Sequence, residues 1–438
     1  MSRRDLVGWA RWHFLRPAAA RPGLRAAAYS LAILATSLLV CWHELPAGPA
    51  SPPVRTAIRV HCGDLATCTF AESLALDVWS DRRGPGAPLD VVVTRAAFAR
   101  LDAAGIPWRT LVPDIDAVAR AEAARLRNPA RASSASFRSL MAARPGDWFS
   151  EYRDFAAIST HLKILAELAP ERVTLQSIGG SIEGRPLWAL RIGGGTPGAT
   201  KMLINGTQHA REWIAAMATT CVADRLVRGY HDDPAIRAFV DSTELWIVPV
   251  ANPDGYQYSW GSDRYWRKNR RAGHGVDLNR NYAIGYGGSG SSGSKRSQIY
   301  RGEYAFSEPE TSALRDLVRR EQIKLHVDFH SFGQLLLYPW SYTAAPAQDR
   351  DRLAAIGDRM ATAMFVTHET RYTLKSGVEL YRAGGTMTDW MYGEAGALSY
   401  TIELRPKNSG GFVLPPEQIR PTCDEALAAV LALRASQP

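Results

Sequence analysis

The sequence predicts an α/β protein in which a mixed sheet is covered by helices on both faces and is preceded by a small α+β unit. Strand-like and helical segments alternate from about residue 148 to the C-terminus, and a shorter strand and helix pattern occupies residues 58–115. An Ala/Arg-rich and then Ser-rich stretch separates the two patterns. Because 438 residues with 46% hydrophobic content can bury more than one core, we expect two folded units and a linker.

Residues 1–50 have the organisation of an export signal. Arginines precede residue 26, an uncharged apolar run covers residues 26–42, and a Pro-rich stretch follows. This order is typical of a secretory signal peptide, and the run is also long enough to remain as a membrane anchor. We expect a secreted or periplasmic protein, with cleavage or anchoring left open. The net charge of +9 comes largely from such Arg-rich stretches, so we expect no nucleic-acid partner.

The unit at residues 58–115 shows the order strand, helix, strand, strand, helix, strand. Its clearest strands are Ile58–Val60, Leu76–Trp79 and Leu89–Val93, and residues 65–74 and 96–104 have helical spacing of apolar residues. This order favours a small α+β sandwich. The stretch 116–147 then predicts a helix in its first half and a linker in its second.

The cysteines suggest an oxidising compartment. Cys62 and Cys68 are close enough to close a small disulfide loop. Cys221 and Cys423 lie in different predicted helices, and the sequence leaves open whether they meet.

The larger unit begins near Trp148 and alternates strands with helices. Strands are predicted at 173–178, 186–192, 202–205, 245–250, 325–330 and 399–404, and helices at 213–228, 308–320, 349–364 and 421–433. Such alternation predicts a mixed sheet covered on both faces, with ligands at the carboxyl ends of its strands. The Gly/Ser run 285–294 has no periodicity and is expected to be a surface loop.

Two histidines and a glutamate lie at such strand ends. His209 and Glu212 follow the strand 202–205 directly, and His330 ends the strand 325–330, on the face that also carries His326 and Asp328. Two nitrogen ligands, one carboxylate and an open position are typical of catalytic zinc. Each motif alone has a plainer reading, a polar turn for the first and a structural histidine for the second, but together they predict a metal site.

A further carboxylate occupies the strand 399–404. Its alternation places Glu403 and Thr401 on the face opposite Tyr400 and Ile402. Glu403 is then either an ion-pair partner of Arg405 or a general base for a hydrolytic water molecule.

From about Trp148 onward the chain resembles the metallocarboxypeptidases of the carboxypeptidase A/B family. The resemblance rests on HAREW at 209–213, NPDGY at 252–256, YWRK at 265–268, DLNRN at 277–281, HSFGQLLLYP at 330–339, Tyr381 with Gly384 and Gly385, and YTIELR at 400–405. It implies a sheet of the eight-stranded type and a peptidase that removes one C-terminal residue at a time.

The resemblance also implies a role for each site residue. One Zn²⁺ per chain would bind His209, Glu212 and His330, with Asp277 orienting His209. Glu403 would be the general base and Arg267 would stabilise the oxyanion. The residues expected to contact the substrate are Asn279 and Arg280 at its terminal carboxylate, Tyr381 over its last residue and Arg211 at the preceding one.

The specificity pocket is expected to be neutral. Relatives that cleave basic residues have an Asp at the position of Thr388, so this chain is predicted to prefer apolar or aromatic C-terminal residues. The other pocket positions are Leu337, Ser341, Ser376 and Thr401. Arg382 would favour acidic ends if it turned inward, but an exposed position is expected. The loop around Gly273 and Arg296 lacks the disulfide cysteines of well-known relatives, so other contacts must stabilise it.

Residues 58–115 resemble the family's propeptide, through LDVW at 76–79, LDVVV at 89–93 and IPWR at 106–109. This implies a ferredoxin-like inhibitory prodomain, an activation linker at 116–147 and a catalytic domain at 148–438. A trypsin-like activating protease would cut at the linker arginines, Arg120, Arg125, Arg127, Arg131, Arg138 or Arg144. The alternative is an ordinary basic linker. The rival functions are a zinc amidase or deacylase with the same metal set, and an inactive peptide-binding relative.

Overall fold

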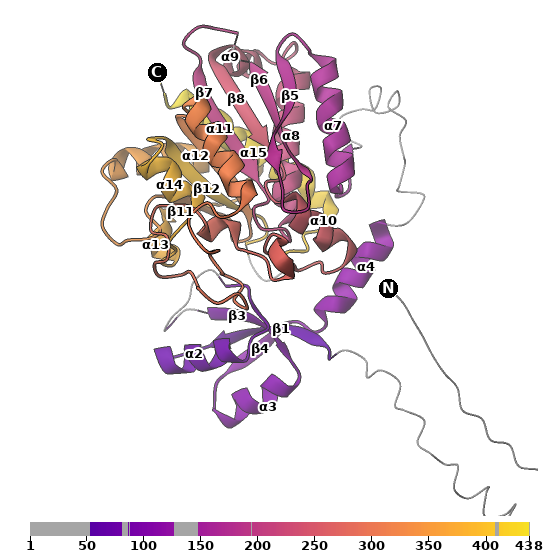
Figure 1. Ribbon diagram of the computed structural model, residues 1–438, viewed down its shortest axis with the longest axis vertical. Helices are drawn as coiled ribbons and strands as arrows, with labels where there is room; N and C mark the ends of the chain where they lie inside the picture. The colour runs from indigo at the N-terminus through magenta and orange to yellow at the C-terminus, as the bar shows by residue number, and fades with distance from the viewer. Residues whose placement is uncertain are drawn as a thin grey trace, which may run out of the picture. The chain divides into compact units, whose positions relative to one another are not determined.

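The computed structural model describes residues 53–80, 86, 88–126, 148–193, 195–407 and 411–437. Within these residues the chain forms the two predicted units, a small α+β unit and a larger α/β unit (Figure 1). No helix among them combines the length and apolar character needed to cross a membrane. The export segment at residues 26–42 lies outside the described residues.

The small unit is an antiparallel four-stranded sheet with two helices. Its elements are β1 (Arg55–His61), α2 (Leu65–Ser73), β2 (Asp77–Val78), β3 (Pro88–Thr94), α3 (Ala96–Ala103) and β4 (Trp108–Val112), and the sheet order is β2-β3-β1-β4. The predicted order of elements is confirmed, and the ferredoxin-like assignment stays a prediction. Cys62 and Cys68 form the expected disulfide, and Asp64 caps α2 by accepting the Thr67 backbone N–H at 2.7 Å.

Helix α4 (Ile115–Leu126) follows the small unit. It confirms the helix predicted for the first half of the 116–147 stretch. Residues 127–147, which include the predicted linker, lie outside the described residues.

The large unit is built on a mixed eight-stranded sheet, as predicted. Its strands are β5 (Val173–Gly180), β6 (Pro186–Gly193), β7 (Thr200–Gly206), β8 (Thr243–Val248), β9 (Leu325–Ser331), β10 (Leu335–Tyr338), β11 (Thr373–Ser376) and β12 (Leu398–Leu404), in the order β11-β10-β12-β9-β7-β8-β6-β5. The central strands β12, β9, β7 and β8 run parallel to one another. Every residue of β8, β9 and β12 is buried, as expected of strands covered on both faces.

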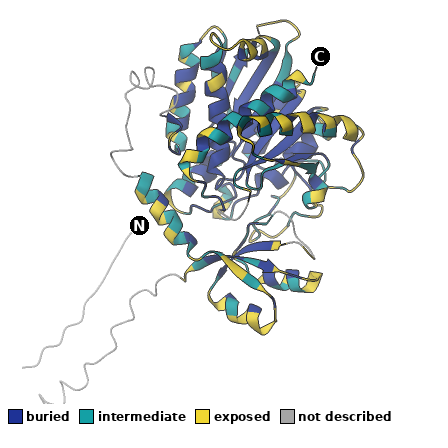
Figure 2. Cartoon of the chain, turned by 180° about the vertical axis from the view of Figure 1, so that it is seen from behind, coloured by how far each residue is buried: buried dark blue, intermediate teal, exposed yellow. Residues whose placement is uncertain are grey.

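Helices cover both faces of this sheet. They are α7 (Phe155–Leu168), α8 (Trp213–Gly229), α9 (Pro234–Ser242), α10 (Pro253–Gly261), α11 (Pro309–Glu321), α12 (Arg350–His368), α13 (Gly377–Leu380), α14 (Met387–Gly393) and α15 (Ile419–Ala435). One core joins α7, α8, α12 and α15 to the sheet, and a second joins α11 and α14 to its other face. Figure 2 shows the buried strands between these layers. The disulfide Cys221–Cys423 connects α8 to α15 and answers the question that the sequence left open.

Several elements have no clear signal in the sequence pattern. The edge strand β11 and its neighbour β10 have four residues each, and α14 has seven. Such short segments show too little periodicity to be recognised locally. The run 285–294 contains no helix or strand, which agrees with the predicted loop.

Candidate active site

His209, Glu212 and His330 meet at the carboxyl ends of β7 and β9, as predicted. The chain leaves β7 at Gly206 and turns into α8, which begins directly after Glu212. The turn is tight, because a Cβ at Gly206 would lie 2.5 Å from Thr219 Oγ1 and 3.0 Å from the Ala215 carbonyl oxygen. A residue without a Cβ is therefore required where β7 approaches α8.

The three side chains present their ligand atoms to one point. His209 Nδ1 lies 2.8 Å from Glu212 Oε1, and His330 Nδ1 lies 3.0 Å from Glu212 Oε2 and 3.1 Å from His209 Nδ1. All three residues are buried. Two imidazole nitrogens and one carboxylate are the donor set of catalytic zinc, so the residues present fit this ion.

Both histidines use their remaining nitrogen to contact a buried carboxylate. His209 Nε2 lies 3.2 Å from Asp277 Oδ1, as the resemblance implied, and His330 Nε2 lies 2.9 Å from Asp328 Oδ2. Burial opposes ionisation of Asp277, but Arg267, Arg280 and His209 lower the pKa of its carboxyl well below the usual value. Sequence reasoning placed Asp328 on the face of His330 but assigned it no role.

Glu403 lies beside the metal-binding residues on the neighbouring strand. β12 runs parallel to β9, and Glu403 is the register partner of His330. Arg405 forms its ion pair with Glu425, so the alternative reading of Glu403 as the partner of Arg405 is not supported. Glu403 is 9% exposed and lies near the carboxyl end of β12, next to the strand end that carries His330.

Arg267 is adjacent to the metal-binding histidine through Asp277. Its Nε and Nη2 atoms donate to Asp277 Oδ2 at 3.1 and 3.0 Å. Asp277 therefore connects one metal-binding histidine to the arginine expected to stabilise an oxyanion.

Arg280 and Tyr381 form the other side of the site. Arg280 donates to the carbonyl oxygens of Gly290 and Asn279, both at 2.7 Å, and to the Tyr381 hydroxyl at 2.8 Å. A guanidinium has five N–H groups, so two have no hydrogen-bond partner among the described residues. Asn279 Oδ1 accepts the Met387 backbone N–H at 2.9 Å, while its amide nitrogen lies 3.4 Å from His330 Nε2. Asn279 thus lies between the two sides of the site.

Thr388 and Thr401 hydrogen-bond to each other through their hydroxyl groups. Thr388 is in α14 and Thr401 in β12, and both are buried. Arg382 is exposed, as expected. A carboxylate next to Thr388 went unnoticed in the sequence: Asp389 accepts the backbone N–H groups of Ser341 and Tyr342 at 2.9 Å and thereby positions that pocket wall.

The small unit and α4 contact Arg211 and Arg264 of the large unit directly. Asp77 of β2 forms an ion pair with the fully buried Arg211. Trp79 stacks on Tyr265 with ring centroids 5.3 Å apart and packs edge-on against Phe412. Glu122 of α4 pairs with Arg264, which also donates to the Arg211 carbonyl oxygen at 2.7 Å. The sequence identified LDVW at 76–79 but could not show that Asp77 and Trp79 enter this site.

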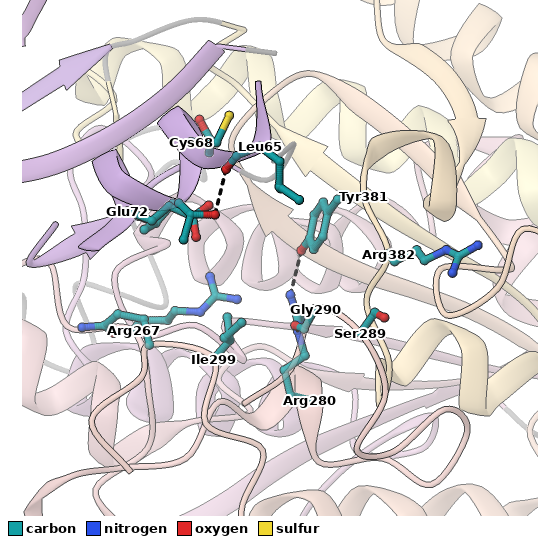
Figure 3. A pocket seen from close by; sticks show the side chains of 14 residues that line it. Leu65, Cys68, Glu72, Arg267, Arg280, Ser289, Gly290, Ile299, Tyr381 and Arg382 are labelled. Atoms are coloured by element: carbon teal, nitrogen blue, oxygen red, sulfur yellow. Dashed lines mark hydrogen bonds between the residues drawn. The ribbon is translucent and has the colours of Figure 1, made fainter. Parts of the chain in front are cut away.

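A cavity of about 360 Å³ lies between α2 and the large-unit residues Arg267, Arg280 and Tyr381. Figure 3 shows its labelled walls, with Leu65, Cys68 and Glu72 of α2 facing Arg267, Arg280, Gly290 and Tyr381. Helix α2 of the small unit therefore forms one wall of this cavity.

A lysine stabilises the loop around Gly273 and Arg296, which lacks the disulfide cysteines of well-known relatives. Lys268, which is buried, donates from Nζ to the carbonyl oxygens of Lys295 and Ser297 at 3.2 and 2.8 Å. Burial lowers the pKa of Lys268 to about 8. Backbone bonds from Gly384 to Ser289 and from Gly385 to Ile284, both 2.9 Å, join this loop to the segment after Tyr381.

A mixed α/β sheet with two histidines and a glutamate at its strand ends defines a zinc hydrolase. The model of the zinc carboxypeptidase family matches residues 158–429, and the chain belongs to this family. It is a metallocarboxypeptidase of the carboxypeptidase A/B type, with Zn²⁺ as its cofactor.

Similar proteins cover nearly the whole chain. Carboxypeptidase A1 of Rattus norvegicus is 31% identical over 415 residues, which are 92% of this chain and 97% of that protein. Carboxypeptidase B2 of Bos taurus is 33% identical over 421 residues, again 92% and 97%. The crystal structure of carboxypeptidase A from Helicoverpa armigera aligns with a TM-score of 0.77 and 29% identity, covering 88% of this chain and 98% of that one.

Proposed function

We propose that this metallocarboxypeptidase is made as a proenzyme and, once cut, releases single apolar or aromatic residues from peptides with a free C-terminal carboxylate. The observation that carries the proposal is a cavity that Arg280 and Tyr381 line together with α2 of the small unit and Arg267, whose partner Asp277 contacts the metal-binding His209. The boundaries proposed are 1–50 for the export segment, 58–115 for the propeptide, 116–147 for the activation linker and 148–438 for the catalytic domain.

The proposed chemistry divides between the metal and the chain. When bound by His209, Glu212 and His330, zinc supplies a Lewis acid that polarises the scissile carbonyl and acidifies water. Glu403 accepts the proton of the attacking water and delivers it to the leaving amine. Arg267 donates to the oxyanion as negative charge develops on the carbonyl oxygen.

Recognition of the chain end is the proposed task of the other side of the cleft. The two remaining N–H groups of Arg280 bind the substrate carboxylate together with Asn279. Tyr381 covers the terminal side chain, and Arg211 contacts the preceding residue. An interior peptide bond offers no such carboxylate, which favours exopeptidase action over a zinc amidase or deacylase.

The contacts of the small unit support latency. Asp77 neutralises Arg211 from within the chain, and Trp79 packs on Tyr265 and Phe412, so a substrate must displace them. Arg120 and Arg125 lie within α4, and Arg125 pairs with Glu151. Because helical backbone is a poor protease substrate, we propose that the cut falls among Arg127, Arg131, Arg138 and Arg144, which lie outside the described residues.

The Thr388–Thr401 pair supports the proposed preference for apolar or aromatic ends, because both of these buried side chains are uncharged. Export, by secretion or to the periplasm, is proposed from residues 26–42 and agrees with the two disulfides. Anchoring through an uncleaved segment remains the alternative form of this proposal.

The decisive experiment is limited trypsin treatment of the purified zinc-loaded chain, followed by assay on peptides ending in Phe, Leu, Lys and Glu. We expect activity to appear after the cut, to be highest on Phe and Leu, and to vanish when the same peptides are amidated. Asp77→Asn should raise the activity of the uncut chain, whereas Asp102→Asn, a change on the far helix α3, should not. Absence of activity on every peptide after cutting would refute the proposal, and hydrolysis of amidated peptides would favour the amidase.

A further inference from the structure

Asp328 is a second buried carboxylate behind the metal centre. It lies two residues before His330 on β9, is fully buried, and its Oδ2 is 2.9 Å from His330 Nε2. Asp277 occupies the equivalent place behind His209, at 3.2 Å from its Nε2. Each metal-binding histidine thus directs Nδ1 to the metal point and Nε2 to a carboxylate.

Among the described residues, each hydrogen-bond partner of the Asp328 carboxylate presents a nitrogen to it. The Gln208 side-chain amide donates to Oδ2 at 2.6 Å, and the Asn205 side-chain amide donates to Oδ1 at 2.7 Å. Gln208 can present its amide nitrogen because its oxygen accepts the Tyr282 hydroxyl at 3.1 Å. A carboxylate accepts from all of these groups, so the proton of the neutral His330 ring lies on Nε2 and the lone pair of Nδ1 points to the metal.

The protons on the side chains behind Asp328 can be assigned in the same way, from Asn205 through His326 to Ser399. Because the Asn205 amide nitrogen faces Asp328, its oxygen faces His326 Nε2, 2.8 Å away, and must accept a hydrogen bond from it. His326 Nδ1 then accepts the Ser399 hydroxyl at 2.7 Å. Burial lowers the pKa of His326 to about 4, which agrees with a neutral ring. The residues of this relay come from β7, β9 and β12, the three central strands that carry the metal centre.

We propose that Asp328 is a positioning residue that fixes the tautomer and orientation of His330 and so raises the affinity for zinc, with Asn205, His326 and Ser399 fixing Asp328 in turn. The inference rests on the zinc site of the proposed function. Partners of this kind orient metal-binding histidines and increase their basicity, and their loss typically weakens metal binding 10- to 100-fold.

Asp328→Asn is a test that the fold can accommodate. With the new amide nitrogen at the Oδ1 position, Asn205 can rotate its amide, and His326 can move its proton from Nε2 to Nδ1 and donate to Ser399. The relay then reverses, with the Ser399 hydroxyl changed from donor to acceptor, and the negative charge behind His330 is lost. The matched control is Asp254→Asn, which alters a carboxylate that is equally buried but bonds to Ser181 and Arg185.

Two measurements on the full-length zinc protein decide the question. Chelator competition should show zinc binding weakened about 10- to 100-fold in Asp328→Asn and unchanged in Asp254→Asn, with the melting temperature of each metal-free protein measured alongside. NMR of ¹⁵N-histidine should show the Nε2–H tautomer of His326 in the parent and the Nδ1–H tautomer in Asp328→Asn.

Equal zinc affinity in Asp328→Asn and the parent, with only the metal-free melting temperature lowered, would show a purely structural role and overturn the inference. So would an Nδ1–H tautomer or a protonated His326 ring in the parent. If the Asp328→Asn protein does not fold, the parent NMR spectrum still decides the relay. Failure of the parent itself to bind zinc would refute the proposed function, so the two failures are distinguishable.

Discussion

The residues of the metal centre and the residues proposed to bind the substrate are held in place by different kinds of contact. His209, Glu212, His330 and Glu403 lie at the ends of adjacent central strands, and the strand register places Glu403 beside His330. Arg280 and Tyr381 instead lie in loops joined by backbone hydrogen bonds and a lysine. The strand register sets the positions of the metal-binding residues and Glu403, whereas the residues proposed to bind the substrate occupy the kind of segment that generally varies more than a sheet.

The largest expected effect tests the sheet side alone. Glu403→Gln removes the proton acceptor but preserves the size of the side chain, so turnover of the cut enzyme should fall about 10²- to 10⁴-fold. Zinc affinity should be unchanged, since Glu403 is not a ligand. Steady-state kinetics and chelator competition provide the two readouts. Retention of a tenth or more of the parent turnover would remove Glu403 from the base role.

Arg280→Ala tests the loop side. Two charge-assisted hydrogen bonds to the substrate carboxylate are lost, each contributing about 1.5–3 kcal/mol, so kcat/KM should fall about 10²- to 10⁴-fold. Zinc affinity and the structure of the sheet should not change. If Arg280→Ala weakened zinc binding as much as catalysis, the two sides of the cleft would not be independent.

Thr388→Asp tests whether the pocket alone selects the substrate. A carboxylate at this position should raise kcat/KM for peptides ending in Lys or Arg about 10-fold or more and lower it for Phe, because a paired charge in a buried site is favourable and an unpaired one is costly. Thr401→Val, which removes a hydroxyl without adding charge, is the control. An unchanged order of preference would place the selecting groups elsewhere.

The smallest effect concerns the lysine that ties the loop. Lys268→Met removes two hydrogen bonds to backbone carbonyls, which contribute about 1 kcal/mol, so KM should rise a few-fold with little change in kcat.

The free energy of unfolding should depend on pH through Lys268. Burial lowers the pKa of Lys268 to about 8 from 10.5, so burying the charged amine destabilises the fold below pH 8, and this cost disappears as the pH rises from about 8 to 10.5.

Denaturant titrations at pH 7.5 and 9.5 would measure this difference. The parent should gain stability relative to Lys268→Met at the higher pH. A stability difference that does not change between the two pH values would show that the lysine keeps its ordinary pKa in the fold.

The sequence by itself determined the two-unit organisation, the central strands and the residues of the metal centre. Strand alternation and the position of His209, Glu212 and His330 after apolar runs are local features, and local patterns are sufficient to predict them. The order of short motifs then identified the family, which the family model confirms. The roles of Arg280, Tyr381 and Glu403 that this family implies stay predictions.

Only the tertiary structure decided which distant groups meet. Asp77 and Arg211 are 134 residues apart, His326 and Asn205 are 121 apart, and the Cys221–Cys423 disulfide spans 202. Local periodicity contains no information on such pairs, because they depend on strand order and on the packing of one unit against another. For the same reason, Asp328 appeared in the sequence as an acidic neighbour of His330, and the hydrogen-bond relay behind it became visible only when β7, β9 and β12 lay side by side.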